Sequence, residues 1–182
     1  MIDLASLFGQ IDIYLFDQLL RGRIGPGMTV LDAGCGHGRN VVFFLRQAYQ
    51  VSAVDPDPDA ILAVRSLAER LAPELPLSNF RAETVESNSF PDHAADVVIS
   101  SAVLHFARDE SHFEAMLRGT WRLVKPKGLF FAASLRRSAW KAGSPPWAGD
   151  VSPFRTAPND TSSTNRIFSS SRLDSGALWP IP

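Results

Sequence analysis

Three glycines at every second position, Gly34, Gly36 and Gly38, form the part of this sequence with the clearest chemical use. They directly follow a short apolar run that ends at Asp32 and Ala33. Glycine allows positive φ and lets the backbone approach a ligand without a Cβ atom in the way. A helix after such a loop presents unpaired N–H groups to an anionic part of that ligand. The loop is therefore predicted to hold a small molecule against the main chain.

Two phosphate-binding motifs have a similar composition, and neither matches. The dinucleotide fingerprint G-x-G-x-x-G needs a glycine at the position of Arg39. A Walker A loop ends in Gly-Lys-Ser/Thr, whereas residues 38–40 are Gly-Arg-Asn. Both phosphate-based interpretations are thereby disfavoured, and a nicotinamide oxidoreductase is kept only as an alternative.

Two carboxylates near the loop indicate which chemical groups the ligand carries. Asp55 ends a second apolar run, 21 residues after Gly34, and a carboxylate at that place can accept both hydroxyls of a ribose. Asp32 lies at the lip of the glycine loop, where it can pair with an ammonium group. An ammonium partner, a diol and an anion at a helix N-terminus together describe an amino acid joined to a nucleoside.

Residues 1–133 alternate between patterns typical of strands and of helices, which supplies a scaffold for these side chains. Strands are predicted at residues 28–32, 51–55, 77–83, 95–100 and 129–133, with a turn at 125–128 before the last. Helices are predicted at residues 4–19 with Asp3 as the cap, at 39–48, after Asp57 with Pro58 first, and after Asp109. Strands separated by helices give right-handed βαβ units, so the predicted fold is an α/β, Rossmann-like, doubly wound and mostly parallel sheet.

The last quarter of the chain has another character. Residues 134–182 contain 10 Ser and 6 Pro but no Glu, His, Tyr or Met. They hold 6 Lys+Arg and 3 Asp+Glu, a net charge of +3, whereas residues 1–133 hold 12 and 16, a net charge of -4. No period of 2 or 3.6 is sustained there. We predict a folded domain over residues 1–137 with the sheet truncated to five strands, and an irregular or disordered tail over residues 138–182.

Such an abrupt loss of periodicity after a good strand is what an out-of-frame or otherwise aberrant C-terminus would produce. A natural variant with a disordered tail is the alternative. An aberrant terminus predicts weak or absent catalysis despite a formed glycine loop.

Composition narrows the class of protein further. The net charge of -1 gives no reason to expect a nucleic-acid partner, and no apolar run approaches the ~20 residues of a membrane-spanning helix. The lone Cys35 excludes an intrachain disulfide and fits a reducing compartment. No secretory signal is evident at the N-terminus, so a cytoplasmic domain is expected. The four histidines lack the spacing of metal ligands, and no metal is predicted.

Four segments in order resemble the class I S-adenosylmethionine-dependent methyltransferases. Residues 30–38, Val-Leu-Asp-Ala-Gly-Cys-Gly-His-Gly, are similar to the first motif of that family, and Asp55 is similar to its ribose ligand. Residues 90–98 resemble the segment that leads into its fourth strand. Residues 121–128 resemble the turn before its fifth strand, with Lys127 in place of a usual glycine. The resemblance covers residues 1 to about 133 and favours the small-molecule methyltransferases.

The resemblance implies S-adenosyl-L-methionine as the cofactor and a set of residues around it. The implied cofactor-binding residues are Asp32, Gly34, Cys35, Gly36, Gly38, Asp55, Pro56, Glu83, Thr84, Ser100 and Tyr14. Glu83 and Thr84 correspond to positions near the adenine, Ser100 to the end of the fourth strand under the sulfonium, and Tyr14 to a helix that folds over the cofactor. Cys35 is expected to pack beneath the loop, and His105 is a candidate general base.

The predicted function is methyl transfer to a small-molecule acceptor, by direct displacement at the sulfonium methyl carbon. A cofactor-binding protein without turnover is the main alternative. A nicotinamide oxidoreductase on the same sheet is disfavoured by Arg39.

Overall fold

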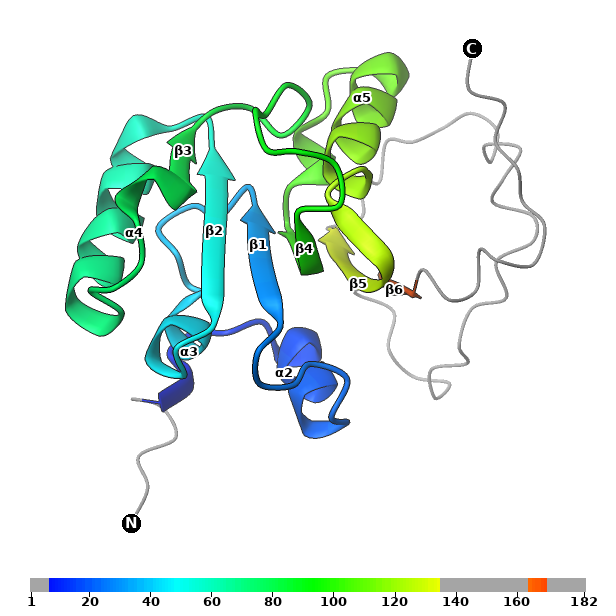
Figure 1. The fold of residues 1–182 in the computed structure, drawn as a ribbon. Coiled ribbons are helices and arrows are strands. Elements are labelled where there is room, and N and C mark those ends of the chain that lie inside the picture. The colour runs from blue at the N-terminus through cyan, green and yellow to red at the C-terminus, as the bar shows by residue number, and fades with distance from the viewer. Residues whose placement is uncertain (1–6, 135–163, 170–182) are drawn as a thin grey trace.

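The computed structural model describes residues 7–134 and 164–169 and shows a sheet with helices packed on both faces (Figure 1). The strands lie side by side in the order β3-β2-β1-β4-β5-β6. Their bounds are β1 Thr29–Ala33, β2 Gln50–Asp55, β3 Phe80–Ala82, β4 Ala95–Ser101, β5 Val124–Ser134 and β6 Thr164–Ser169. The helices are α2 Ile13–Leu20, α3 Val42–Arg46, α4 Pro58–Leu71 and α5 Glu110–Trp121, with short 3-10 turns η1 Leu77–Asn79 and η2 Leu104–Phe106.

The first five strands are parallel, which confirms the predicted doubly wound α/β fold. β1 lies between β2 and β4, so β2 and β3 extend the sheet on one side and β4 and β5 on the other. The chain therefore changes direction across the sheet at the β1–β4 pair. Ligands of such sheets bind beyond the carboxyl ends of the strands at this switch point.

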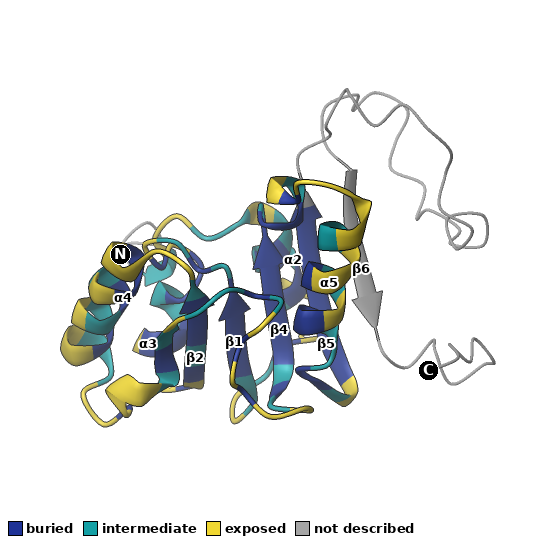
Figure 2. Ribbon diagram, turned by 90° about the horizontal axis from the view of Figure 1, so that it is seen from above, coloured by how far each residue is buried: buried dark blue, intermediate teal, exposed yellow. Residues whose placement is uncertain are grey.

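Each face of the sheet packs against its own helices. Neighbouring residues of a strand point to opposite faces, and Val30 and Leu31 of β1 accordingly enter different cores. The first core, which contains Val30, lies between the sheet and α2, α3 and α4. The second core, which contains Leu31, lies between the sheet and α5. Figure 2 shows the buried strands between helices whose outer surfaces are exposed.

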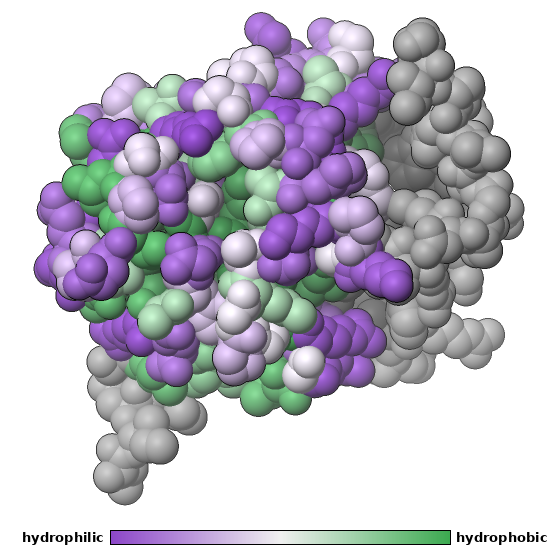
Figure 3. All heavy atoms as spheres, in the orientation of Figure 1, coloured by the Kyte–Doolittle hydropathy of each residue, from purple (hydrophilic) through white to green (hydrophobic). Residues whose placement is uncertain are grey.

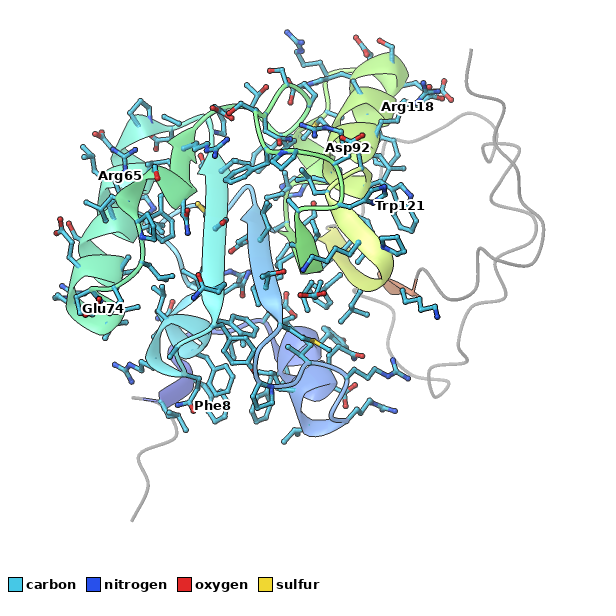
Figure 4. All side chains as sticks on the ribbon, viewed as in Figure 1. Phe8, Arg65, Glu74, Asp92, Arg118 and Trp121 are labelled. Atoms are coloured by element: carbon cyan, nitrogen blue, oxygen red, sulfur yellow. The ribbon has the colours of Figure 1, made fainter. Side chains whose placement is uncertain are left out.

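Aromatic contacts join helical segments to one another on one face and a helix to the sheet on the other; Phe8 and Trp121 are labelled in Figure 4. Phe8 stacks on Phe43 of α3 with ring centroids 4.8 Å apart, and it meets Phe16 of α2 edge-on at 4.7 Å. On the opposite face Trp121 of α5 meets Phe130 of β5 edge-on at 5.4 Å. Such pairs contribute about 0.5–1.5 kcal/mol beyond the apolar area that they bury.

The outward surface carries many polar residues beside a few exposed apolar ones, such as Leu20 and Phe106. On the face shown in Figure 3, hydrophilic residues gather over α5, where Arg118 and Glu114 form an ion pair at 3.7 Å. Within residues 7–134 no helix combines the length and the apolar character needed to cross a membrane.

Two of the predicted helix caps are confirmed. Asp57 accepts a hydrogen bond from the Asp59 N–H at 3.0 Å, and Pro58 is the first residue of α4. Asp109 accepts one from the His112 N–H at 2.8 Å at the start of α5. Each cap satisfies a donor that has no partner within its helix.

The helix predicted over residues 4–19 is wrong in its extent. The chain turns at Gly9, whose φ is +63°, and α2 begins only at Ile13. Asp12 accepts a hydrogen bond from the Tyr14 N–H at 3.0 Å and is the cap of α2. The break occurs because glycine enters the left-handed conformation that ends a helix at little cost. The predicted cap Asp3 lies outside the described residues.

Two other predicted elements are shorter than expected. α3 occupies Val42–Arg46 rather than residues 39–48, because the chain first makes a turn in which the Val41 N–H donates to the Gly38 carbonyl. β3 is limited to Phe80–Ala82, because the three residues before it form η1.

The turn predicted at residues 125–128 lies inside β5 as a bulge. Ala95 pairs with Val124, and the next paired residues are Val97 and Leu129, so four residues of β5 stand opposite one of β4. Lys127 in this bulge has φ +66°, a conformation that favours glycine. This backbone conformation explains why the family that the sequence resembles usually has a glycine where this chain has Lys127.

The prediction of a sheet truncated to five strands is wrong. β6 pairs antiparallel with β5, from Leu129 opposite Ser169 to Ser134 opposite Thr164. A sheet that ended at β5 would leave the backbone groups of its outer edge unpaired, and a further strand satisfies them. The sequence Thr-Asn-Arg-Ile-Phe-Ser lacks sustained alternation, so periodicity did not identify it. The rest of the predicted tail, with the proposed boundary after residue 137, lies outside the described residues.

Gly119 lies inside α5, where glycine costs about 1 kcal/mol relative to alanine. A Cβ atom at this position would collide with the carbonyl oxygen of Val85 and lie 2.7 Å from the Cα of Glu86. Asn88 joins the same segments, because its Nδ2 donates to the Val85 carbonyl at 2.8 Å and to the Gly119 carbonyl at 3.3 Å. Close approach of α5 to the loop before β4 therefore requires glycine here.

Gly119→Ala is expected to lower the free energy of unfolding by about 1–3 kcal/mol, because the backbone of the loop cannot move aside as a flexible side chain can. Helix propensity alone predicts a gain of about 1 kcal/mol. Urea unfolding followed by circular dichroism decides between the two. Ser66→Ala on the exposed surface of α4 is the control, with an expected change within about 0.5 kcal/mol. An equal or higher stability of Gly119→Ala would contradict the packing argument.

Candidate cofactor site

The carboxyl ends of β1, β2 and β4 bring together the residues that the motifs singled out. The glycine loop follows β1, Asp55 is the last residue of β2, and Ser100 is the penultimate residue of β4. Ala33 stands opposite Val54, so β1 and β2 end at the same edge of the sheet. The predicted site therefore lies at the switch point of the fold.

The three glycines of the loop have different structural roles, although all have positive φ. A Cβ atom on Gly34 would collide with the side chain of Val103. A Cβ atom on Gly38 would lie 3.0 Å from two side chains of α4. At Gly36 a Cβ atom would meet nothing within 4 Å. Packing thus requires Gly34 and Gly38, whereas Gly36 faces space that a ligand can fill.

Backbone hydrogen bonds hold the loop against β2. The N–H groups of Gly34 and Cys35 both donate to the Val54 carbonyl, at 2.8 and 3.1 Å. The Gly36 N–H donates to Oδ2 of Asp55 at 2.8 Å. Since α3 begins only at Val42, the loop does not run directly into a helix N-terminus. The N–H groups of a helix N-terminus, which we expected to face an anionic group of the ligand, therefore do not directly follow the loop.

Asp55 is oriented by two backbone donors before any ligand binds. Its Oδ2 accepts from Gly36, and its Oδ1 accepts from the Asp57 N–H at 3.0 Å. A carboxylate oxygen can accept about two hydrogen bonds, so each oxygen keeps an unused site. Two adjacent hydroxyls of a ligand can occupy these sites. Pro56 follows directly and is exposed.

Asp32 is the least satisfied polar residue of the site. Its side chain is buried, with 1% of the residue exposed, and neither oxygen accepts a hydrogen bond from a described residue. Burial raises the pKa of Asp32 to about 7; the Arg39 guanidinium opposes this rise and the Asp55 charge adds to it. A buried ionised carboxylate is costly unless a cation or several donors accompany it. This position therefore suits a cationic group of a ligand.

Glu83 and Thr84 begin the loop after β3, and in this structure both bond within that loop. The Glu83 carboxylate accepts from the N–H of Ser89 at 2.7 Å and from its hydroxyl at 2.6 Å. Burial alone would raise the pKa of Glu83, but these bonds and the nearby Arg81 outweigh it and lower the pKa. The Thr84 and Ser87 hydroxyls lie 2.8 Å apart. Contact of either residue with an adenine stays a prediction.

Ser100, His105 and Tyr14 lie on elements that border the site. Ser100 is fully buried and stands opposite Ala132 in the second core, on the face away from Asp32. His105 belongs to η2, with its ring 4.2 Å from that of Phe106. Tyr14 of α2 packs against the first core. None of the three donates a hydrogen bond to Asp32.

Cys35 packs beneath the loop as expected. It is buried in the first core, and burial, reinforced by Asp32 and Asp55, raises the pKa of its thiol far above the ordinary value. Such a thiol is not a nucleophile at neutral pH. His37 in the same loop is exposed. In the described part of the chain no group of three or more His, Cys, Asp or Glu residues is placed to hold a metal ion.

A polar network that the motifs did not reveal lies beside the glycine loop. Ser101 donates from Oγ to Oδ2 of Asp12 at 2.9 Å, and Arg39 donates to Ser101 Oγ at 2.9 Å. The Asp12 N–H donates to Oδ1 of the buried Asn40 at 2.9 Å. Arg39 and Asn40 directly follow the loop, so an extended motif would have included them. Asp12 carries no such indication, because its partners are 28 and 89 residues away in the chain.

Comparison with known proteins agrees with this geometry. Residues 31–132, more than half of the chain, match the family described as "Methyltransferase domain". The chain belongs to the S-adenosylmethionine-dependent methyltransferases. S-adenosyl-L-methionine is therefore the cofactor of this domain.

Two relatives show the extent of the match. The "Ubiquinone biosynthesis O-methyltransferase" of Methylocella silvestris is 35% identical over 126 residues, which cover 67% of this chain and 47% of the relative. The "Uncharacterized methyltransferase YodH" of Bacillus subtilis is 30% identical over 152 residues, which cover 80% of this chain and 60% of the relative. This methyltransferase domain spans about half the length of the curated relatives that it matches.

A solved structure shares the fold. The Burkholderia thailandensis 1,6-didemethyltoxoflavin-N1-methyltransferase, with bound 1,6-didemethyltoxoflavin and S-adenosylhomocysteine, has a TM-score of 0.57 and 24% identity. The match covers 75% of this chain and 57% of that chain.

The residues of this methyltransferase domain fit its cofactor chemically. Asp32 offers a buried carboxylate without a partner, and Asp55 offers a fixed carboxylate with unused acceptor sites. Gly36 leaves open space beside the loop, because a Cβ atom there would meet nothing within 4 Å. A molecule with an ammonium group and a ribose diol meets all three requirements.

Asp32→Asn is expected to raise the stability of the ligand-free domain at pH 8. The pKa of Asp32 is about 7 in the folded chain, above the ordinary value of 3.8, so the folded state keeps a proton that the unfolded state loses. Stability from this group is complete below pH 3.8 and is lost as the pH rises to about 7. Asparagine carries no charge and does not titrate. The free energy of unfolding of the variant, relative to that of the wild type, should therefore rise by roughly 2–4 kcal/mol from pH 4 to pH 8.

Urea unfolding at both pH values measures this gain. Asp59→Asn, which neutralises an exposed carboxylate at the start of α4, is the control and should leave the pH dependence unchanged. Equal pH dependence of Asp32→Asn and the wild type would show that Asp32 is satisfied in the folded protein.

Proposed function

We propose that this chain binds S-adenosyl-L-methionine at the carboxyl ends of β1 and β2 and transfers its methyl group to a small-molecule acceptor. The observation that carries the proposal is the buried, partnerless carboxylate of Asp32, two strand positions before a loop that is open at Gly36. Burial of a carboxylate without a partner destabilises the folded state, so a ligand that pairs with Asp32 gives a reason for its presence.

The proposal gives each residue a role. Asp32 pairs with the ammonium group of the cofactor, and Asp55 accepts hydrogen bonds from the ribose hydroxyls through the oxygen sites that Gly36 and Asp57 leave unused. Glu83 and Thr84 border the adenine. Further predicted contacts come from the loop and from the elements around it: Gly34, Cys35, Gly38, Pro56, Ser100 and Tyr14.

The bound cofactor supplies an electrophilic methyl group. The protein then has to align the acceptor with that group and exclude water, and ideal alignment is worth up to roughly 7–11 kcal/mol of the barrier. No acid and base pair is required for this. For an acceptor that attacks through a hydroxyl, His105 is the proposed group that takes the proton, because imidazole can do so near neutral pH.

Two observations support a small molecule as the acceptor. The names of the ubiquinone O-methyltransferase and the toxoflavin N1-methyltransferase refer to small-molecule products or substrates. The net charge of -1 provides no broad basic surface for nucleic acid.

Cofactor binding without turnover is the second candidate. It is favoured by the composition of residues 134–182, which differs from that of the rest of the chain.

Calorimetry with S-adenosylhomocysteine tests the site. Asp55→Ala should weaken binding at least a hundredfold, because it removes two charge-assisted hydrogen bonds worth about 1.5–3 kcal/mol each. Glu74→Ala, an exposed carboxylate near the far end of α4 (Figure 4), is the matched control and should bind like the wild type. Unchanged affinity in Asp55→Ala would remove the ribose assignment. Gly36→Val should abolish binding, because its side chain enters the space left for the ligand and a β-branched residue is strained at φ +50°. Circular dichroism checks that the domain is still folded.

A methyl-transfer assay against a panel of small-molecule phenols, amines and thiols separates the two candidates. It is run only with protein for which cofactor binding has been measured. Methylated product supports the enzyme, and we expect His105→Ala to slow transfer to a phenol about 10²-fold or more. Binding without any product supports the second candidate.

A further inference from the structure

Asp12 joins three parts of the chain at the edge of the site. Its Oδ1 caps α2 through the Tyr14 N–H, and its Oδ2 accepts from Ser101 at the end of β4. The Arg39 guanidinium lies 3.8 Å from the same oxygen. The Asp12 N–H donates to Asn40, directly after the glycine loop. A residue that served only as a helix cap would not need the contacts to β4 and to the loop.

This cluster lies beyond Asp32 on the same face of the sheet. Asp32 follows Val30 by two residues and stands opposite Ile99, and both neighbours belong to the first core. Ser101 stands opposite Ala133, also in the first core, and lies two residues further along β4 than Ile99. Two residues of a strand span about 6.6 Å. The contact between Asp12 and Ser101 is therefore one step outward from Asp32, toward the carboxyl edge.

Asp32 is closed off in this arrangement. Neither of its oxygens contacts solvent. α2 covers this face, since Leu15 is fully buried in the first core and Gln18 is 1% exposed. The half-exposed Arg39, whose charge acts on Asp32, lies beside Asp12, whose side chain is 13% exposed. A ligand group can reach Asp32 only when part of this cover moves.

We propose that Asp12 is a positioning residue of the cofactor site, which holds α2 closed over Asp32 through Ser101 and Arg39. The inference rests on the proposed function, because it assigns Asp32 to the bound cofactor. The contact has to open for the cofactor to enter or leave, and it closes again over the bound molecule. Loss of the contact should therefore speed both association and dissociation, and change affinity less than either rate.

Asp12→Ala and Asp109→Ala form a matched pair for the test. Both remove an aspartate that caps a helix, so both lose the stability of a cap, but Asp109 begins α5 on the opposite face of the sheet. In Asp12→Ala we expect the amides of α2 to exchange with deuterium about tenfold faster, and S-adenosylhomocysteine to dissociate about tenfold faster by surface plasmon resonance. Asp109→Ala should change neither quantity. Equal acceleration in both variants would overturn the inference, because it would reflect stability alone.

Ser101→Ala removes the bridging hydroxyl and leaves the cap of α2 in place. It should reproduce the faster dissociation, and the double variant with Asp12→Ala should be no faster than Asp12→Ala itself. Independent, additive effects would overturn the inference. Failure of the wild type to bind S-adenosylhomocysteine would instead refute the proposed function. The exchange rates of α2 in the ligand-free variants still decide whether Asp12 holds this helix closed.

Discussion

Asp32 stands on the central strand of the sheet with its carboxylate shielded from water and without a donor among the described residues. β1 is paired on both sides and packed on both faces, so the residue cannot turn outward. A one-residue shift of the strand would bring Asp32 and its apolar neighbours to the wrong faces. The fold therefore imposes a penalty on the charged form that a cationic ligand can relieve. Stability and binding oppose one another at this residue.

Near Asp32, residues of the same type have different roles, some in packing and some in binding. Gly34 and Gly38 let the loop pack against Val103 and α4, and Gly36 leaves room on the other side. Asp55 fixes the loop through the Gly36 N–H and keeps acceptor sites for a ligand. The loop and the second carboxylate are thus already in place before binding, which lowers the entropic cost of binding.

Contacts from distant parts of the chain complete the domain. Asp12 brings α2 to the end of β4, although 89 residues separate it from Ser101. β6 covers the outer edge of β5, which otherwise presents unpaired backbone groups. Gly119 brings α5 against the loop that precedes β4. All three contacts join residues that are far apart in the chain.

The sequence by itself determined the parallel α/β sheet, the caps Asp57 and Asp109, the glycine loop and its carboxylates. These depend on local causes: apolar periodicity, the conformational range of glycine, and the distance along the chain from one strand end to the next. Only the tertiary structure decided which glycine faces open space, where the N-terminal helix breaks, and that a sixth strand joins the sheet. It also decided that Asp32 is left without a partner while Asp12 gains several. Those properties depend on which residues meet across the fold, and contacts between residues far apart in the chain leave no periodic trace in its sequence.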